Sequence, residues 1–236
     1  MSKIIIFANQ KGGVGKSTCT LLSANALSQE PFDKSVFIVD ADKQRSIARK
    51  RMADLQVYDE ASPYQVQQMT IKDFLNQKTG IYKLDTDYDY VFIDVPGKLD
   101  NNLPIDQQEI TKYLQFADYL FIPFVPGAFQ MDATLDFLKI AMKVKSQRKG
   151  KGRDLNVIGF INLFEQRTLD DRFLLEEIEE LQTMINVKFM ENKLNRYALY
   201  RNTNTLISFF DKDAKGKSEQ NFKNWFLEFN KIVNNG

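Results

Sequence analysis

The chain has 236 residues, of which 43% are hydrophobic and 27% charged, a composition that excludes a disordered protein and allows a substantial buried core. Lysine and arginine total 32 against 31 acidic residues, so the net charge of +1 excludes a global attraction to nucleic acid or anionic membranes. The chain has no histidine and one cysteine, Cys19, which excludes an intramolecular disulfide and a cysteine-rich metal site and leaves carboxylates, lysines, backbone amides and bound ions for any chemistry.

Short apolar runs alternate with helix-like segments along the chain. The runs that predict strands are Lys3–Ala8, Ser35–Asp40, Asp89–Asp94, Tyr119–Val125 and Asn156–Leu163. The segments that predict helices are Lys16–Gln29, Ile71–Gln77, Gln107–Phe116, Met131–Gln147, Asp170–Met184 and Ser218–Val233. This alternation predicts an α/β fold in one domain, with a mostly parallel twisted sheet and helices on both faces. Two segments are less clear: Arg51–Thr70 shows no period, and Asn186–Ser208 could hold a short strand, a loop and a helical turn.

The first predicted strand leads into a glycine-rich turn, and a helix begins at Lys16. In this arrangement backbone amides and a helix N-terminus face an anion, and glycines let the chain wrap closely around phosphate oxygens. Lys16 adds a charge for the β- and γ-phosphates, Ser17 offers its hydroxyl to Mg²⁺, and Thr18 is a candidate for the α-phosphate. The candidate nucleotide-binding residues of the loop are Gly12, Gly13, Val14, Gly15, Lys16, Ser17 and Thr18. The segment therefore predicts a P-loop NTPase that binds ATP and Mg²⁺.

The loop departs from the general P-loop pattern at one position. Gln10 stands where that pattern has glycine, and a second lysine, Lys11, follows it. The string from Asn9 to Thr18 closely resembles the deviant Walker A motif of the ParA/MinD family of partitioning and positioning ATPases. The resemblance implies an ATP-bound homodimer in which Lys11 reaches the partner's phosphates, so that phosphoryl transfer depends on dimerisation. The alternative is that Lys11 is a solvated loop lysine.

Carboxylates end the second and third predicted strands, where open parallel sheets bind their ligands. Asp94 follows an apolar run and occupies the Walker B position, from which a carboxylate holds Mg²⁺ directly or through water. The family resemblance implies that Asp42 positions the attacking water and that Asp40 lies beside the metal. Lys11, Lys16 and Asp42 are thus the candidate catalytic residues, and Ser17, Asp40 and Asp94 the candidate Mg²⁺ ligands. The alternative for each aspartate is a turn residue at a strand end.

Later segments extend the resemblance. Pro96-Gly97 resembles the family's switch II turn, and Asn162, near the end of the fifth predicted strand, resembles its adenine-contacting asparagine, whose amide can both donate and accept. Three residues after the fourth predicted strand resemble positions that brace the nucleotide and form part of the dimer face: Phe129, Asp132 and Thr134. A plain buried strand and helix is the alternative for this last segment.

Three alternatives remain for what the protein acts on. The resemblance implies a slow ATPase, stimulated by a cargo-adaptor protein, that partitions or positions DNA or another cargo and binds DNA non-specifically in its ATP state. A basic stretch could supply the phosphate contacts: Lys139, Lys143, Lys145, Arg148, Lys149, Lys151 and Arg153. It could equally be a solvated helix end. The other two alternatives are a MinD-like membrane-associated ATPase and a small-molecule ATP-dependent ligase.

The last predicted helix bears on the membrane alternative. Its apolar residues recur at helical spacing: Phe222, Trp225, Phe226, Phe229, Ile232 and Val233. Lys223 and Lys231 are nearly offset by Glu228, which favours a core-packed helix over a membrane anchor. We find no signal-peptide pattern and no apolar stretch of about 18 residues, so we expect a cytoplasmic protein, associated with the nucleoid if it binds DNA.

Overall fold

A parallel sheet forms the centre of the computed structural model, which describes residues 1–97, 108–150, 152, 154–166, 168–185 and 187–235. Its strands are β1 (Lys3–Phe7), β2 (Val36–Asp40), β3 (Gln65–Gln68), β4 (Tyr90–Asp94), β5 (Tyr119–Phe124), β6 (Asn156–Phe164), β7 (Lys188–Phe189) and β8 (Leu194–Asn195). They lie in the order β3-β2-β4-β1-β5-β6-β7, with β8 pairing with β6. Every pairing within the described residues is parallel, in agreement with the predicted fold class.

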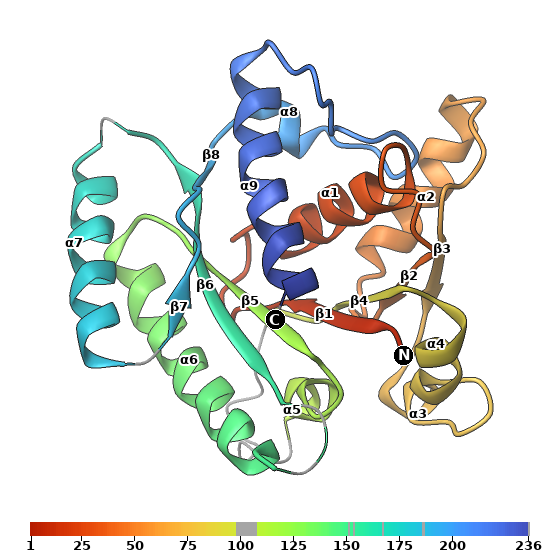
Figure 1. Ribbon diagram of the computed structural model, residues 1–236, viewed down its shortest axis with the longest axis horizontal. Helices are drawn as coiled ribbons and strands as arrows, with labels where there is room; N and C mark the ends of the chain where they lie inside the picture. The colour runs from red at the N-terminus through yellow and green to blue at the C-terminus, as the bar shows by residue number, and fades with distance from the viewer. Residues whose placement is uncertain (98–107, 151, 153, 167, 186, 236) are drawn as a thin grey trace.

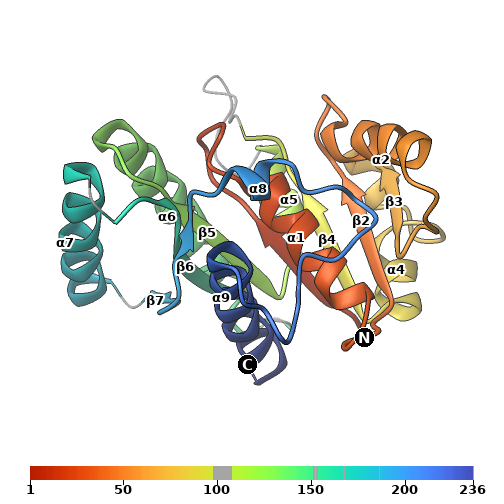
Figure 2. The same cartoon turned by 90° about the horizontal axis from the view of Figure 1, so that it is seen from above.

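Helices cover both faces of the sheet (Figures 1 and 2). They are α1 (Lys16–Ser28), α2 (Ser46–Val57), α3 (Ile71–Phe74), α4 (Ile81–Asp87), α5 (Glu109–Leu114), α6 (Ala128–Arg148), α7 (Leu169–Met184), α8 (Ala198–Arg201) and α9 (Lys217–Asn235). Successive side chains of a strand point to opposite faces. Ile4 and Ile6 of β1 therefore join the core under α3 to α7, whereas Ile5 and Phe7 join the core under α1, α2, α8 and α9.

The structure confirms each predicted strand and helix, with differences at their ends, and Gln107 lies outside the described residues. It adds α2, which begins before the segment Arg51–Thr70 and runs into it, and β3, which lies within it. The buried face of α2 carries Ile47, Arg51 and Asp54, while Met52 and Leu55 face solvent, so its apolar residues do not mark the buried side. β3 is a polar edge strand without an apolar run. Neither element shows the periodicity that identified the others.

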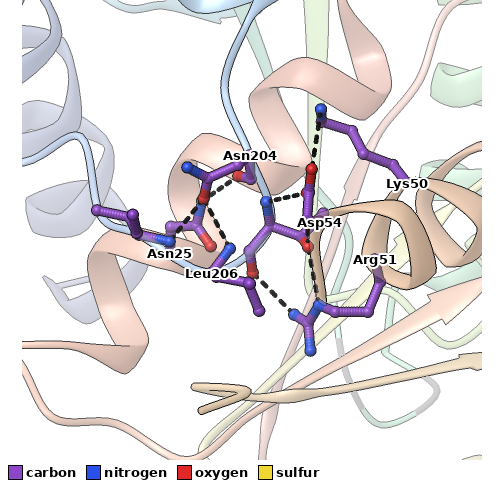
Figure 3. A network of polar contacts seen from close by, with 8 residues as sticks. Asn25, Lys50, Arg51, Asp54, Asn204 and Leu206 are labelled. Carbon is purple, nitrogen blue, oxygen red and sulfur yellow. Dashed lines mark hydrogen bonds and ion pairs between the residues drawn. The ribbon is translucent and has the colours of Figure 1, made fainter. Parts of the chain in front are cut away.

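A network of buried polar contacts fixes α2 (Figure 3). The Arg51 guanidinium donates from Nε and Nη2 to the side-chain and backbone oxygens of Thr205, each at 2.9 Å, and from Nη1 to the Tyr64 carbonyl at 2.8 Å. Asp54 Oδ2 accepts from the Thr205 N–H at 2.7 Å and from its hydroxyl at 2.9 Å. Asn25 of α1 accepts from the Tyr64 hydroxyl at 2.8 Å. The network thus joins α1, α2, the start of β3 and the loop before α9.

Replacing Arg51 by methionine, which has a similar length, is expected to lower the free energy of unfolding by about 3 kcal/mol, because two buried carbonyls lose their donor. Urea denaturation followed by circular dichroism measures the change. Arg49→Met on the exposed face of the same helix is the matched control and should stay within about 0.5 kcal/mol of the parent. Equal losses in the two variants would show that the buried contacts of Arg51 contribute nothing specific.

The apolar stripe of α9 packs beneath β1, as the sequence predicts. Phe222, Trp225, Phe226 and Phe229 are fully buried. The Phe7 ring lies 6.2 Å from Trp225 and 5.8 Å from Phe229, measured between centroids. This stripe is therefore core rather than a surface for lipid. Among the described residues, no helix combines the length and the apolar character needed to cross a membrane.

Candidate functional site

The predicted site residues meet at the carboxyl ends of three neighbouring strands. In the sheet register, Asp94 at the end of β4 pairs with Phe7 of β1 on one side and with Asp40 of β2 on the other. The Ala41 N–H also donates to the Asp94 carbonyl at 2.9 Å. The glycine-rich loop follows β1 directly, so the loop and both carboxylates lie side by side, as the sequence predicts.

The loop adopts a conformation that requires its glycines. Gly13 and Gly15 have φ values of 77° and 88°, in the left-handed region where side chains are strained. Gly15 is the N-cap of α1 and no side chain caps the helix, so the N–H groups of the first turn face the loop's concave side, where an anion is stabilised.

Lys16 lies inside this loop. Its side chain is buried, and its Nζ donates to the Lys11 carbonyl at 2.9 Å. Burial lowers the pKa of Lys16, and the charges of Asp94 and Asp42 oppose that shift. A Cβ added to Gly97 would lie 2.5 Å from this Nζ, so the predicted Pro96-Gly97 turn closes over the lysine. The ammonium group is therefore held at the centre of the site, where a phosphate would compensate its charge.

Asn9 holds the start of the loop, a role that we did not predict from the sequence. Its Nδ2 donates to the Pro123 carbonyl at 2.9 Å and to the Thr134 hydroxyl at 2.8 Å. Its Oδ1 accepts from the Lys11 N–H at 3.0 Å. Asn9 thus links the loop to β5 and α6, and it fixes the backbone of Lys11 while leaving the Lys11 side chain exposed. The one sequence signal for this role was an asparagine directly after an apolar strand, and that position does not show which groups the amide contacts.

Asp94 and Ser17 form the oxygen-rich side of the site. The Ser17 hydroxyl lies 2.8 and 3.0 Å from the two carboxylate oxygens of Asp94. Burial raises the pKa of Asp94 to about 7, with Asp40 acting in the same direction and the Ser17 hydrogen bond and Lys16 charge acting against it. A buried carboxylate with this pKa is poorly compensated, and a cation would stabilise its charged form.

Asp40 and Asp42 differ in their surroundings. Asp40 is fully buried, and its Oδ2 accepts from the Ala48 N–H in the first turn of α2 at 2.9 Å, so it caps that helix. Its Oδ1 has no hydrogen-bond partner within the described chain. Asp42 is half-buried and accepts from the Gln44 N–H at 2.9 Å. Its charge raises the pKa of both Lys16 and Asp94, so the three groups belong to one electrostatic site.

The donor set fits Mg²⁺. Mg²⁺ prefers oxygen ligands and is held by one or two carboxylates together with phosphate oxygens and water. Here the Ser17 hydroxyl touches Asp94, and the unpartnered Oδ1 of Asp40 lies at the neighbouring strand end. Among the described residues, no three acidic or sulfur side chains gather as a self-sufficient metal cage. The geometry therefore suits an ion that arrives with a phosphate-bearing ligand.

Asn162 lies behind the loop. It is buried, and its Nδ2 donates to the Val14 carbonyl at 2.8 Å. A Cβ added to Gly15 would lie 2.4 Å from that nitrogen, so glycine is needed for the approach. The amide thus supports the loop backbone, while the predicted adenine contact stays a prediction.

The structure corrects the predicted basic patch. Arg148 is buried, and its Nη1 donates to the carbonyls of Leu114, the last residue of α5, and Ala117 at 2.7 and 2.5 Å. It is unavailable to a nucleic acid phosphate, because the side chain is buried. Lys139 pairs with Asp136 at 2.8 Å. Lys143 and Lys149 are exposed and Lys145 half-buried. Lys151, Arg153 and the Phe129 side chain lie outside the described residues.

Comparison with known proteins gives consistent results. The model of the CobQ/CobB/MinD/ParA nucleotide binding domain matches residues 5–219. A putative plasmid partition protein from Borrelia burgdorferi, solved with bound AMPPNP, is 21% identical, with a TM-score of 0.63 over 98% of this chain and 99% of that chain. Cobyrinic acid a,c-diamide synthase from Mycobacterium smegmatis, solved with ADP and magnesium, is 16% identical, with a TM-score of 0.64 over 99% and 96%. An uncharacterized protein of Methanocaldococcus jannaschii is 24% identical over 221 residues, which cover 78% of this chain and 82% of that protein.

Proposed function

Because the chain belongs to the CobQ/CobB/MinD/ParA family of nucleotide-binding proteins, we propose that it is a ParA-type ATPase that dimerises when it binds ATP. It hydrolyses ATP to ADP and phosphate, and its ATP-bound dimer binds DNA non-specifically to partition or position a cargo. A cargo-adaptor protein stimulates the hydrolysis. The likeness to a plasmid partition protein supports this choice within the family.

The arrangement of the two loop lysines carries the proposal. Lys16 is buried and directed into its own loop, whereas the Lys11 side chain is exposed and its backbone is held from both sides. An exposed lysine on a fixed backbone is available to a second subunit facing the loop. A cation supplied in trans stabilises the charge that develops during phosphoryl transfer, so hydrolysis becomes conditional on dimerisation.

The remaining residues have distinct roles in this mechanism. The first-turn amides of α1 and the Lys16 ammonium bind and orient the phosphates. Ser17, Asp94 and Asp40 would hold Mg²⁺, which neutralises phosphate charge when bound. Asp42 orients the attacking water by accepting its hydrogen bond, and Asn162 keeps the loop backbone in place. Lys11 of the facing subunit completes the site.

The DNA contact is expected to use Lys143, Lys145 and Lys149. These lysines lie on the last turns of α6 and just beyond it, and none forms an ion pair within the described residues. With a net charge of +1, a monomer attracts DNA weakly, and a dimer that doubles the patch gains affinity through counterion release.

Replacing Asp42 by alanine is expected to stop hydrolysis while ATP binding persists, because the water loses its acceptor and the phosphate contacts remain. The variant should therefore accumulate as an ATP-bound dimer, measured by sedimentation velocity with ATP and by phosphate release. Asp59→Ala, an exposed carboxylate beyond α2, is the control and should hydrolyse ATP like the parent. Normal turnover in Asp42→Ala would remove Asp42 from the mechanism.

Co-sedimentation of the Asp42→Ala protein with duplex DNA and with anionic liposomes, with and without ATP, tests the function itself. We expect ATP-dependent binding to duplex of arbitrary sequence that weakens with log salt at a slope near −0.9 per neutralised phosphate. Alanine at Lys143, Lys145 and Lys149 should flatten that slope. Binding to liposomes alone would favour the membrane-associated alternative.

A small-molecule ATP-dependent ligase is the second candidate function. It is favoured by the likeness to cobyrinic acid a,c-diamide synthase, which covers nearly the whole of both chains. Binding of the Asp42→Ala protein to neither DNA nor liposomes would favour this candidate.

A further inference from the structure

Helix α7 presents large apolar side chains to solvent. Leu169, Phe173 and Met184 are 68%, 59% and 76% exposed. They recur at spacings of four and eleven residues, which place them on one face of the helix. The opposite face, with Leu174 and Ile178, packs into the core. Leu169 and Phe173 lie one turn apart and form an exposed apolar pair, with Met184 three turns further along the same face, which makes this face a candidate interaction surface.

Acidic side chains share this face. Glu176 and Glu180 lie between Phe173 and Met184, at spacings of three and four residues from them. Neither forms an ion pair within the described residues. Two like charges one turn apart destabilise a helix by a few tenths of a kcal/mol. The α7 face therefore combines apolar contact area with a net negative charge, since Arg172 is one exposed cation beside Glu176, Glu177 and Glu180.

Helix α2 presents the opposite combination. Met52 is 68% exposed on the side away from the buried Asp54, and Leu55, one turn after the buried Arg51, is 45% exposed at the margin of the buried face. Arg49 in the first turn is exposed three residues before Met52, on the same side of the helix, and Arg45, the N-cap residue with a left-handed backbone, is exposed at the start of α2. The α2 face thus pairs apolar side chains with positive charge.

The two helices lie at opposite ends of the molecule. Figures 1 and 2 place α7 at one end of the long axis and α2 at the other. The sheet edges beneath them do not invite strand pairing, because β3 is four polar-rich residues and β7 is two residues long. A contact between copies at these ends would therefore use the helices.

We propose that the α2 face of one copy packs against the α7 face of the next copy. Arg45 and Arg49 would meet Glu176 and Glu180, and the exposed apolar side chains would cover one another. A contact between two α7 faces would place glutamates opposite glutamates, and a contact between two α2 faces would place arginines opposite arginines. Both would be repulsive, so the favourable contact is head to tail. Such a contact leaves one free face at each end and extends into a row of copies.

We expect this contact between copies to be weak, because its area is small and its ion pairs are exposed. One helix face offers less area than the roughly 800 Å² per partner of a stable interface. Its ion pairs are exposed and screened by salt, with a Debye length of about 10 Å at 0.1 M ionic strength. Assembly therefore rises with protein concentration and falls with added salt. It needs no nucleotide, so it is independent of the proposed ATPase function.

Charge reversal tests the proposal. Sedimentation velocity of nucleotide-free Lys16→Ala protein, a background chosen to exclude ATP-bound dimers, should show a sedimentation coefficient that increases with concentration. Adding Glu176→Lys with Glu180→Lys, or Arg45→Glu with Arg49→Glu, should abolish the increase. Mixing the two variants, or combining all four changes in one chain, should restore it. Lys212→Glu with Lys215→Glu, two exposed charges elsewhere, is the matched control and should leave it unchanged.

Site-specific crosslinking checks the register of the contact. Met52→Cys and Phe173→Cys in separate chains should form a mixed disulfide when the two are combined, and neither should crosslink to itself. Cys19 does not compete, because it is buried and burial raises the pKa of its thiol. A parent that stays monomeric at every concentration, or a four-fold variant that does not recover assembly, overturns the proposal.

Discussion

Lys16→Ala is expected to lower ATP affinity by about 100-fold or more. The side chain is buried in its own loop and is held by the Lys11 carbonyl, so its charge is directed at the space where the phosphates would lie. Loss of a charge-assisted hydrogen bond costs about 3 kcal/mol when its partner is left without a donor, which corresponds to about two orders of magnitude in the dissociation constant. Isothermal titration with ATP and Mg²⁺ measures the change.

The fold should survive this substitution. Lys16 is a buried cation whose pKa is lowered by burial, so removing it relieves a desolvation cost in the nucleotide-free protein. Thermal unfolding without ATP should match that of the parent or rise slightly, while the stabilisation that ATP gives the parent should disappear. Lys143→Ala, an exposed lysine on α6, serves as the control and should bind ATP normally. Unchanged ATP affinity in Lys16→Ala would contradict the phosphate assignment of the whole loop.

Lys11→Ala is expected to separate binding from turnover. The interactions of Lys11 with its own loop use its backbone, which accepts from Lys16 and donates to Asn9, and alanine keeps both. ATP affinity should therefore change less than about threefold, since only an exposed side chain is lost. ATP-dependent dimerisation should be lost and hydrolysis should fall by about 10³-fold, the smaller end of the effect of a cation supplied in trans.

Titration with a non-hydrolysable analogue, sedimentation velocity and phosphate release distinguish these outcomes. If Lys11→Ala and Lys16→Ala lose ATP affinity equally, Lys11 acts within its own loop and the trans role is wrong. If Lys11→Ala dimerises and hydrolyses like the parent, Lys11 is a solvated loop lysine. Either result leaves the phosphate-binding role of Lys16 intact.

The phosphate loop could be identified from sequence because its determinants are local. The positive φ values of Gly13 and Gly15 and the helix N-terminus at Lys16 depend on a few consecutive residues, which occur at a fixed spacing. The same holds for Asp94, which ends an apolar strand. The parallel register pairs Asp94 with Phe7, and this places Asp94 beside the loop that follows β1. The order of the strands was therefore nearly enough to predict that the site residues at their carboxyl ends lie close together.

Charged residues that are buried could not be identified in the same way. Arg148 looks like part of a basic surface in sequence, but its partners are carbonyls 31 and 34 residues earlier in the chain. Arg51 bonds Thr205, 154 residues later. Whether an arginine faces solvent or the interior depends on which distant oxygens lie within reach of its guanidinium, and no local pattern records that.

The sequence by itself determined the α/β fold, the parallel sheet and the phosphate loop, because apolar periodicity and glycine spacing act over short stretches of chain. Only the tertiary structure decided that Asn9 holds the loop, that Asp40 caps α2 and that Arg148 is unavailable to a ligand. It also decided that α2 and α7, the helices that carry the basic and acidic residues of the proposed contact, lie at opposite ends of the molecule. These features arise when the sheet order brings distant segments together, and the hydrogen bonds and exposed faces that result belong to the assembled fold rather than to any one segment.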